Sequence, residues 1–155
     1  MIPLLLNEAS LTLLELVAEA TQKFAAMDEA AWQYRSAAGK WCRKEVLGHL
    51  VDSAACNHQR FLRAQLEEEI YSGPGYPQDD FVRLQQYATA DTATLVALWR
   101  AFNIHLAHVV RNIDPGKLDV ACSIGNNAPV TLSFVVTDYV AHLHHHLEAL
   151  FTEHT

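Results

Sequence analysis

The chain has 155 residues, half of them hydrophobic and 19% charged, so we predict one folded domain over residues 1–155 rather than a disordered chain. Eleven basic and eighteen acidic residues give a formal net charge of −7, which has the wrong sign for binding the phosphates of a nucleic acid. No apolar run approaches the roughly 20 residues of a membrane span, and the three cysteines form no CxxC pair. Residues 1–10 have neither the basic segment nor the long apolar run of a signal peptide, so we expect none there. We therefore expect a cytoplasmic protein that binds no nucleic acid and no membrane.

Hydrophobic periodicity predicts the first two helices. Apolar residues at three- and four-residue steps favour a first helix over residues 7 to 27, with Asn7 or Ser10 as its cap. A loop through residues 38–40 leads to a second helix over residues 43 to 69. That helix ends in the segment 71–77, whose glycines and prolines are typical of turns.

The second half of the chain predicts a short helix and two long ones. The short helix reaches Tyr87 and is capped by Asp79 or Asp80, and the next helix opens at residues 91–92. After residues 114–116 a loop of about fifteen residues leads to Thr131, the expected cap of the last helix. Residues 118–124 in this loop are a weak candidate for a strand. Four amphipathic helices must bury their apolar stripes together, so we predict an all-α four-helix bundle.

Nine histidines make the composition unusual, and four of them lie in the last helix. At about 100° per residue, His142 and His146 fall on an inward-facing line, whereas His144 and His145 point away from it. The i, i+4 spacing lets two imidazoles share one metal ion, as the histidines of an HExxH motif do. HExxH itself is absent, because no carboxylate lies between the pair.

A third ligand has to come from another helix. His49 on the second long helix and His105 on the third both lie at the margin of an apolar stripe, and either could reach the pair. His49 follows Gly48, whose missing side chain leaves space for a close neighbour. From these residues alone, histidines that bind no metal are as well supported as a metal site. The histidine run could be a solvated helix end, and buried polar groups need partners but not an ion.

Three segments of the sequence resemble the DinB superfamily of metalloenzymes. They are GKWCRKEVLGHLVDS at residues 39–53, NHQRF at residues 57–61, and DYV at residues 138–140 followed by the histidine pair. The family pattern has a tryptophan, a serine or threonine cap, a helix with a histidine in its second turn, and an HxxxH pair near the C-terminus. The resemblance covers almost the whole chain. It implies a DinB-like bundle with up-down-down-up topology.

The resemblance also implies a divalent ion held by His49, His142 and His146. Imidazole ligands suit zinc or nickel, with iron, manganese and copper as alternatives. Cys42 stands where the family has serine or threonine, which should weaken the start of that helix. Because metal binding needs neutral imidazoles with an ordinary pKa of about 6.5, we expect occupancy to fall below about pH 6.

Three histidine ligands leave an open position on the ion, which is typical of a catalytic site. The ion could activate water for hydrolysis or a low-molecular-weight thiol for transfer to an electrophile. Relatives that depend on bacillithiol or mycothiol favour the thiol as cofactor, with a small molecule as substrate. Asp52 and Asp138 could orient an imidazole or accept a proton, and Arg60 could bind an anionic substrate group. The alternative function is that of a non-catalytic, stress-related metal-binding or interaction protein.

Large aromatic residues lie in or beside the predicted loops. They are Trp32, Tyr34, Trp41, Tyr71, Tyr76 and Phe81. Such side chains either cap the ends of a bundle or form a contact surface between molecules. Because homodimers are the commonest soluble assembly and relatives of this family are often dimeric, we predict a homodimer.

Overall fold

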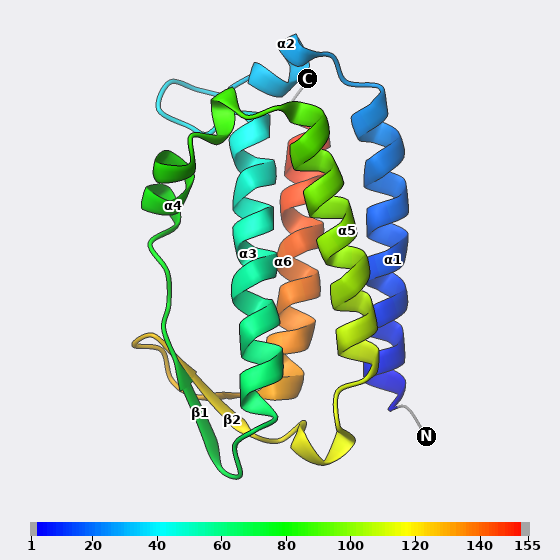
Figure 1. Cartoon of the computed structure of the whole chain (residues 1–155), viewed down its shortest axis with the longest axis vertical. Helices are drawn as coiled ribbons and strands as arrows, with labels where there is room; N and C mark the ends of the chain where they lie inside the picture. Colours follow the sequence, from blue (N-terminus) through cyan, green and yellow to red (C-terminus); the bar gives the residue numbers. More distant parts are fainter. Residues whose placement is uncertain (1–2, 153–155) are drawn as a thin grey trace.

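The computed structural model describes residues 3–152, so His154 lies outside the described residues. Four long helices form a bundle: α1 (Leu4–Ala25), α3 (Arg43–Ala64), α5 (Thr92–Arg111) and α6 (Leu132–Thr152). Both α1 and α3 pack against α5 and α6, so α5 and α6 lie diagonally across the bundle from each other (Figure 1). The prediction of a mostly helical four-helix bundle is confirmed.

The chain also forms a small sheet that an all-α fold does not contain. Strands β1 (Ile70–Gly73), β2 (Ala121–Ile124) and β3 (Val130–Thr131) lie in that order, with β1 parallel and β3 antiparallel to β2. The strand candidate at residues 118–124 is therefore confirmed for its last four residues, which form β2. The turn interpretation of residues 71–77 was wrong for its first three residues, because β1 is stabilised by pairing with a segment about 50 residues away and carries no local signal.

Short helices connect these elements. They are α2 (Glu29–Gln33), α4 (Gln78–Gln85), η1 (Tyr87–Thr89) and η2 (Pro115–Lys117), of which the sequence predicted only α4.

Two predicted helix caps are present in the structure. Asp91 caps α5 by accepting a hydrogen bond from the Thr94 N–H at 2.9 Å. Thr131 caps α6 by accepting one from the Phe134 N–H at 3.1 Å.

Two other predicted caps were wrong. Helix α1 already begins at Leu4, and Ser10 is buried inside it, where its hydroxyl donates to the Ala107 carbonyl at 2.8 Å. Helix α4 begins after Pro77, which places Asp79 and Asp80 in its first turn. There their charges favour the helix by facing its positive end, but neither residue is the cap.

Helix α5 is, within residues 3–152, the one helix long and apolar enough to cross a membrane by length and composition. It carries Arg100 and the buried Asn103, and it packs between α1 and α3 through buried residues such as Trp99 and Leu106. The core helix of a bundle passes the same length and composition test.

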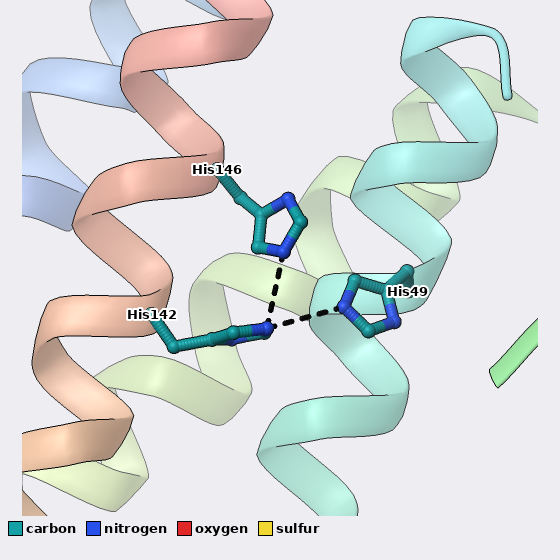
Figure 2. Close-up of side chains that lie close together, drawn as sticks. All are labelled: His49, His142 and His146. Atoms are coloured by element: carbon teal, nitrogen blue, oxygen red, sulfur yellow. Dashed lines mark hydrogen bonds between the residues drawn. The ribbon is translucent and has the colours of Figure 1, made fainter. Parts of the chain in front are cut away.

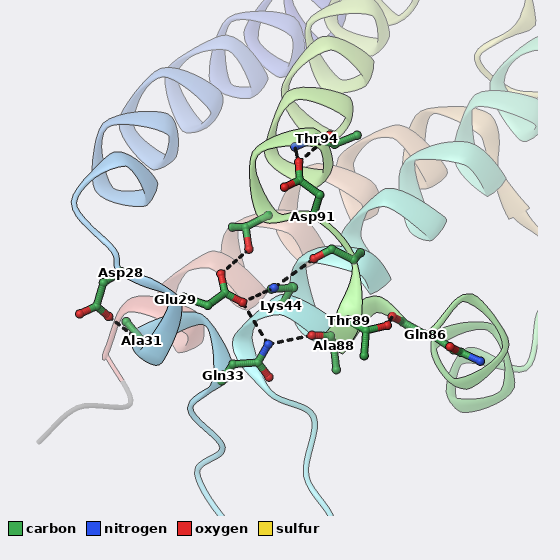
Figure 3. A network of polar contacts seen from close by, with 12 residues as sticks. Asp28, Glu29, Ala31, Gln33, Lys44, Gln86, Ala88, Thr89, Asp91 and Thr94 are labelled. Carbon is green, nitrogen blue, oxygen red and sulfur yellow. Dashed lines mark hydrogen bonds and ion pairs between the residues drawn. The ribbon is translucent and has the colours of Figure 1, made fainter.

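A polar network joins α2, α3 and the start of α5 at the upper end of the bundle in Figure 1, as Figure 3 shows in detail. The buried Lys44 ammonium pairs with the Glu29 carboxylate and donates to the Ala90 carbonyl at 3.1 Å. Glu29 also accepts from the Thr92 hydroxyl at 2.7 Å and from the Gln33 amide at 3.1 Å. These hydrogen bonds, that from Lys44 above all, lower the pKa of Glu29 to about 2.

Most of the loop aromatics are covered by the chain itself. Trp32 and Tyr71 are buried, Trp41, Tyr76 and Phe81 are half-buried, and Tyr34 is 39% exposed. Most of these aromatic side chains therefore cap the bundle and are not available for a contact between molecules. The homodimer, which was predicted from them, stays a prediction.

Candidate metal centre

The start of α3 positions the first histidine. Cys42 and Glu45 form a capping box, in which the Glu45 carboxylate accepts from the Cys42 N–H at 2.8 Å and the Cys42 thiol faces the Glu45 N–H. Both halves of the box are thus present although Cys42 replaces the expected serine or threonine. His49 follows two turns later and is fully buried.

Three histidines converge between α3 and α6 (Figure 2). The Nε2 atom of His142 lies 3.4 Å from Nε2 of His49 and 3.0 Å from Nε2 of His146. One ring nitrogen of each residue lies within 4.8 Å of the others, and no other group of three potential metal ligands was found among residues 3–152. Two nitrogens about 2.0–2.1 Å from one tetrahedral zinc ion would be roughly 3.4 Å apart, so the observed spacing is close to that of a metal site.

The other histidines do not take part in this cluster. His105, the alternative third ligand, is exposed and packs its ring 5.4 Å from that of His58. His144 and His145 are exposed on the outer face of α6, as the winding of that helix predicted.

Burial controls the protonation of the cluster. Desolvation first, and then the neighbouring imidazoles, lower the pKa of His49 to about 4 and that of His146 to about 4. Desolvation also lowers the pKa of His142, against an opposing effect of the Asp138 carboxylate. His49 and His146 therefore stay neutral well below pH 6. The expected loss of metal below about pH 6 was based on ordinary imidazoles and stays a prediction; the lowered pKa values favour a loss at lower pH.

Aromatic rings surround His49. The Trp41 ring lies 5.0 Å from its imidazole and the Tyr76 ring 6.5 Å from it. Gly48, which precedes His49, was predicted to leave space for a close neighbour. That neighbour is the Tyr87 ring, because a Cβ added to Gly48 would lie 2.1 Å from it. The His49 Nδ1 atom is buried and has no hydrogen-bond partner within the described part of the chain.

The two predicted carboxylates have different surroundings. Asp52 is buried and accepts hydrogen bonds from the Tyr87 hydroxyl at 2.7 Å and the Gln85 amide at 2.8 Å. The structure shows no bond from Asp52 to a cluster imidazole, so its expected role of orienting a ligand is not supported by the geometry. Asp138 is exposed and lies one turn before His142, whose pKa it influences.

A cavity of about 480 Å³ opens beside His142. Asp138 and Arg60 line it together with Ser53, Asn57 and Tyr76, and β2 and β3 contribute Cys122, Ile124 and Val130. A second cavity, of about 500 Å³, reaches His146 from the side of Trp41. Ser53, Asn57 and Tyr76 were not among the predicted site residues. For the first two, the one available signal is their spacing of four and eight residues from His49.

Comparisons with known proteins agree with this architecture. The family model of the DinB superfamily matches residues 13–150. Among solved structures, the chain is similar to YfiT from Bacillus subtilis, described as a probable metal-dependent hydrolase with an unusual four-helix bundle topology. The TM-score is 0.82 and the identity 24%, over 96% of this chain and 84% of that one.

A second similar structure is the mycothiol-dependent maleylpyruvate isomerase, with a TM-score of 0.74 and 14% identity. The match covers 94% of this chain but only 60% of the isomerase chain. No curated protein sequence matched the chain. At these identities, both structural similarities establish the fold alone.

Proposed function

This chain belongs to the DinB superfamily, and on that basis we propose that it is a metal-dependent enzyme in which His49, His142 and His146 hold one divalent ion. The observation that carries the proposal is the convergence of three ring nitrogens from two helices beside an open cavity. We propose zinc or nickel as this ion, since both accept imidazole ligands.

The hydrogen-bonding capacity of the cluster supports an ion at its centre. The Nε2 atom of His142 contacts both other Nε2 atoms. A ring nitrogen either donates one proton or accepts with one lone pair, so His142 cannot satisfy both neighbours fully. A cation between the three rings would use all three lone pairs at once, and the lowered pKa values of His49 and His146 keep those lone pairs free of protons.

When bound, the ion would supply Lewis acidity that lowers the pKa of a water or of a thiol. Asp138 lines the same cavity as His142, and it is the one acidic side chain that lines it within the described part of the chain. We propose that its carboxylate accepts the proton released from that nucleophile. The descriptions of the two similar structures name a metal-dependent hydrolase and a mycothiol-dependent isomerase. The activity assay below therefore includes both water and a thiol as nucleophile.

We propose for this chain the up-down-down-up order of its long helices. The direction of the colours in Figure 1 supports it: α1 and α6 begin at the lower end of the bundle, and α3 and α5 begin at the upper end. This order places His49 opposite the histidine pair although the two segments are about 90 residues apart.

Elemental analysis of untagged protein tests the metal site. We expect about one equivalent of a divalent metal in the wild type and loss of metal in the double variant His142→Ala/His146→Ala. The matched control is His144→Ala/His145→Ala, which removes two exposed histidines from the same helix and should keep its metal. Full occupancy in the first variant would disprove the site.

Turnover tests the enzymatic part of the proposal. The metal-loaded protein is assayed with nitrophenyl esters, which report water as nucleophile, and with chlorodinitrobenzene plus a small thiol, which reports thiol transfer. We expect one of the two activities, and we expect it to fall by about 100-fold in Asp138→Asn. A loaded protein that turns over neither class of substrate would favour the non-catalytic binding function.

A further inference from the structure

One face of α3 carries a row of polar side chains that leads away from the histidine cluster. His49, Ser53, Asn57 and Arg60 follow one another at helical spacing. The last three line the cavity of about 480 Å³, which His142 and Asp138 of α6 border on the opposite side. The cavity therefore has the cluster near one end and a guanidinium near the other, separated along α3 by eleven residues, or roughly 16 Å.

Arg60 has no carboxylate partner among residues 3–152, although the chain as a whole has a surplus of acidic residues. Its two hydrogen bonds, to the Asn57 side-chain oxygen and to the Pro74 carbonyl, are both long at 3.4 Å. Arg60 is half-buried, and among residues 3–152 it is the one basic side chain other than His142 that lines this cavity. A half-buried guanidinium that faces a cavity with weakly used donors is suited to an anionic ligand.

We propose that Arg60 binds a carboxylate at the end of an elongated small substrate, whose reacting group lies beside the three histidines. This inference rests on the proposed function, because it assigns the substrate class of that same cavity. A single planar guanidinium matches a carboxylate, which it can bind through two parallel hydrogen bonds. Asp138, at the cluster end of the cavity, repels a carboxylate and so fixes which way round the substrate binds.

The test compares charged and uncharged probes in the zinc-loaded protein. Isothermal titration calorimetry measures the affinities of mercaptopropionate, mercaptohexanoate and mercaptooctanoate, together with those of the corresponding mercapto-alcohols. In the wild type we expect the longer acids to bind about 10- to 100-fold more tightly than their alcohols, since a hydrogen-bonded ion pair contributes about 1.5–3 kcal/mol. The shortest acid should show little preference, because it cannot reach Arg60.

Variants at Arg60 and Arg63 give the decisive comparison. Arg60→Gln should remove the preference for the acid, and Arg60→Lys should keep part of it. Arg63→Gln is the matched control: Arg63 lies almost one turn further along α3, is exposed, bonds to Gln59 and does not line this cavity. An undiminished preference for acids in Arg60→Gln, or an equal loss in Arg63→Gln, would overturn the inference.

A second measurement separates this inference from the metal site. The metal-free protein is titrated with heptanoate, which has one carboxylate, and with heptanamide while the Arg60 side-chain N–H resonances are followed by NMR. We expect shifts with heptanoate alone. If the protein fails to load zinc but shows these shifts, the proposed metal chemistry is wrong and the carboxylate site stands. If zinc loads and heptanoate shifts nothing, the carboxylate site is wrong and the metal site stands.

Discussion

Replacing His49 with glutamine tests how strongly burial of the histidine cluster couples folding to pH. In the unfolded chain the imidazole has its ordinary pKa of 6.5, whereas burial in the fold lowers the pKa to about 4. Between these two values the unfolded chain binds a proton that the folded chain excludes, so acid favours unfolding. The stability that depends on neutral His49 is therefore complete above pH 6.5 and is lost as the pH falls towards 4.

The size of this effect follows from the same two values. For a single group that shifts from 6.5 to about 4, acidification from about pH 7 to about pH 4.5 lowers the free energy of unfolding by about 2 to 3 kcal/mol. His49 is fully buried, so solvent screening does not reduce this figure greatly. Glutamine has no titrating group, and His49→Gln should lack this part of the acid destabilisation.

The assay is urea unfolding of metal-free protein, followed by circular dichroism at several pH values between about 7 and 4.5 in the presence of a chelator. The measurement is the difference between the wild type and His49→Gln in how steeply the free energy of unfolding changes with pH. A loss of stability that is the same at every pH does not affect this difference. His144→Gln, which replaces an exposed histidine on α6, serves as the control and should follow the wild type. Parallel curves for the wild type and His49→Gln would refute the reasoning.

Three further results are expected. Gly48→Ala should lower the free energy of unfolding by about 2–4 kcal/mol in chemical denaturation. The new methyl group displaces the Tyr87 ring and weakens its hydrogen bond to Asp52. Tyr87→Phe removes only that hydrogen bond and should lower the free energy of unfolding by about half as much. Glu29 has a pKa lowered to about 2, so its contribution to stability is present above pH 4.5 and is lost towards pH 2, and Glu29→Gln should flatten that part of an acid titration followed by circular dichroism. Light scattering should give about twice the 17.3 kDa of one chain at micromolar concentrations, and the monomer mass would contradict the homodimer.

The long helices could be predicted because their signals are local. Apolar periodicity placed α3 and α6 correctly at their starts, and the caps Asp91 and Thr131 depend on residues three positions away. The inward line of His142 and His146 followed from the winding of one helix. Strand β1 could not be found in this way, because its partner β2 lies about 50 residues further along the chain.

The third histidine of the cluster depends on which helices are neighbours, and a single sequence does not contain that information. Periodicity placed both His49 and His105 at the edge of an apolar stripe but could not tell which helix lies next to α6. In the bundle α3 is the neighbour and α5 lies diagonally opposite, which excludes His105. The resemblance to the family selected His49. The hydrogen bonds of Asp52 to Tyr87 and Gln85 are equally non-local, and no spacing in the sequence indicates them.

The small sheet has a consequence for the order in which the molecule assembles. Pairing of Tyr71 with Cys122 closes a loop that contains α4 and all of α5, whereas most contacts within the helices are local. Closing long loops is slow, so the helices are expected to form before the sheet. Cys122 and Ile124 of β2 and Val130 of β3 form one wall of the cavity beside His142. Native-state hydrogen exchange should therefore find the amides of β2 opening at lower free energy than those of α3, so that the cavity wall can detach while the bundle stays folded.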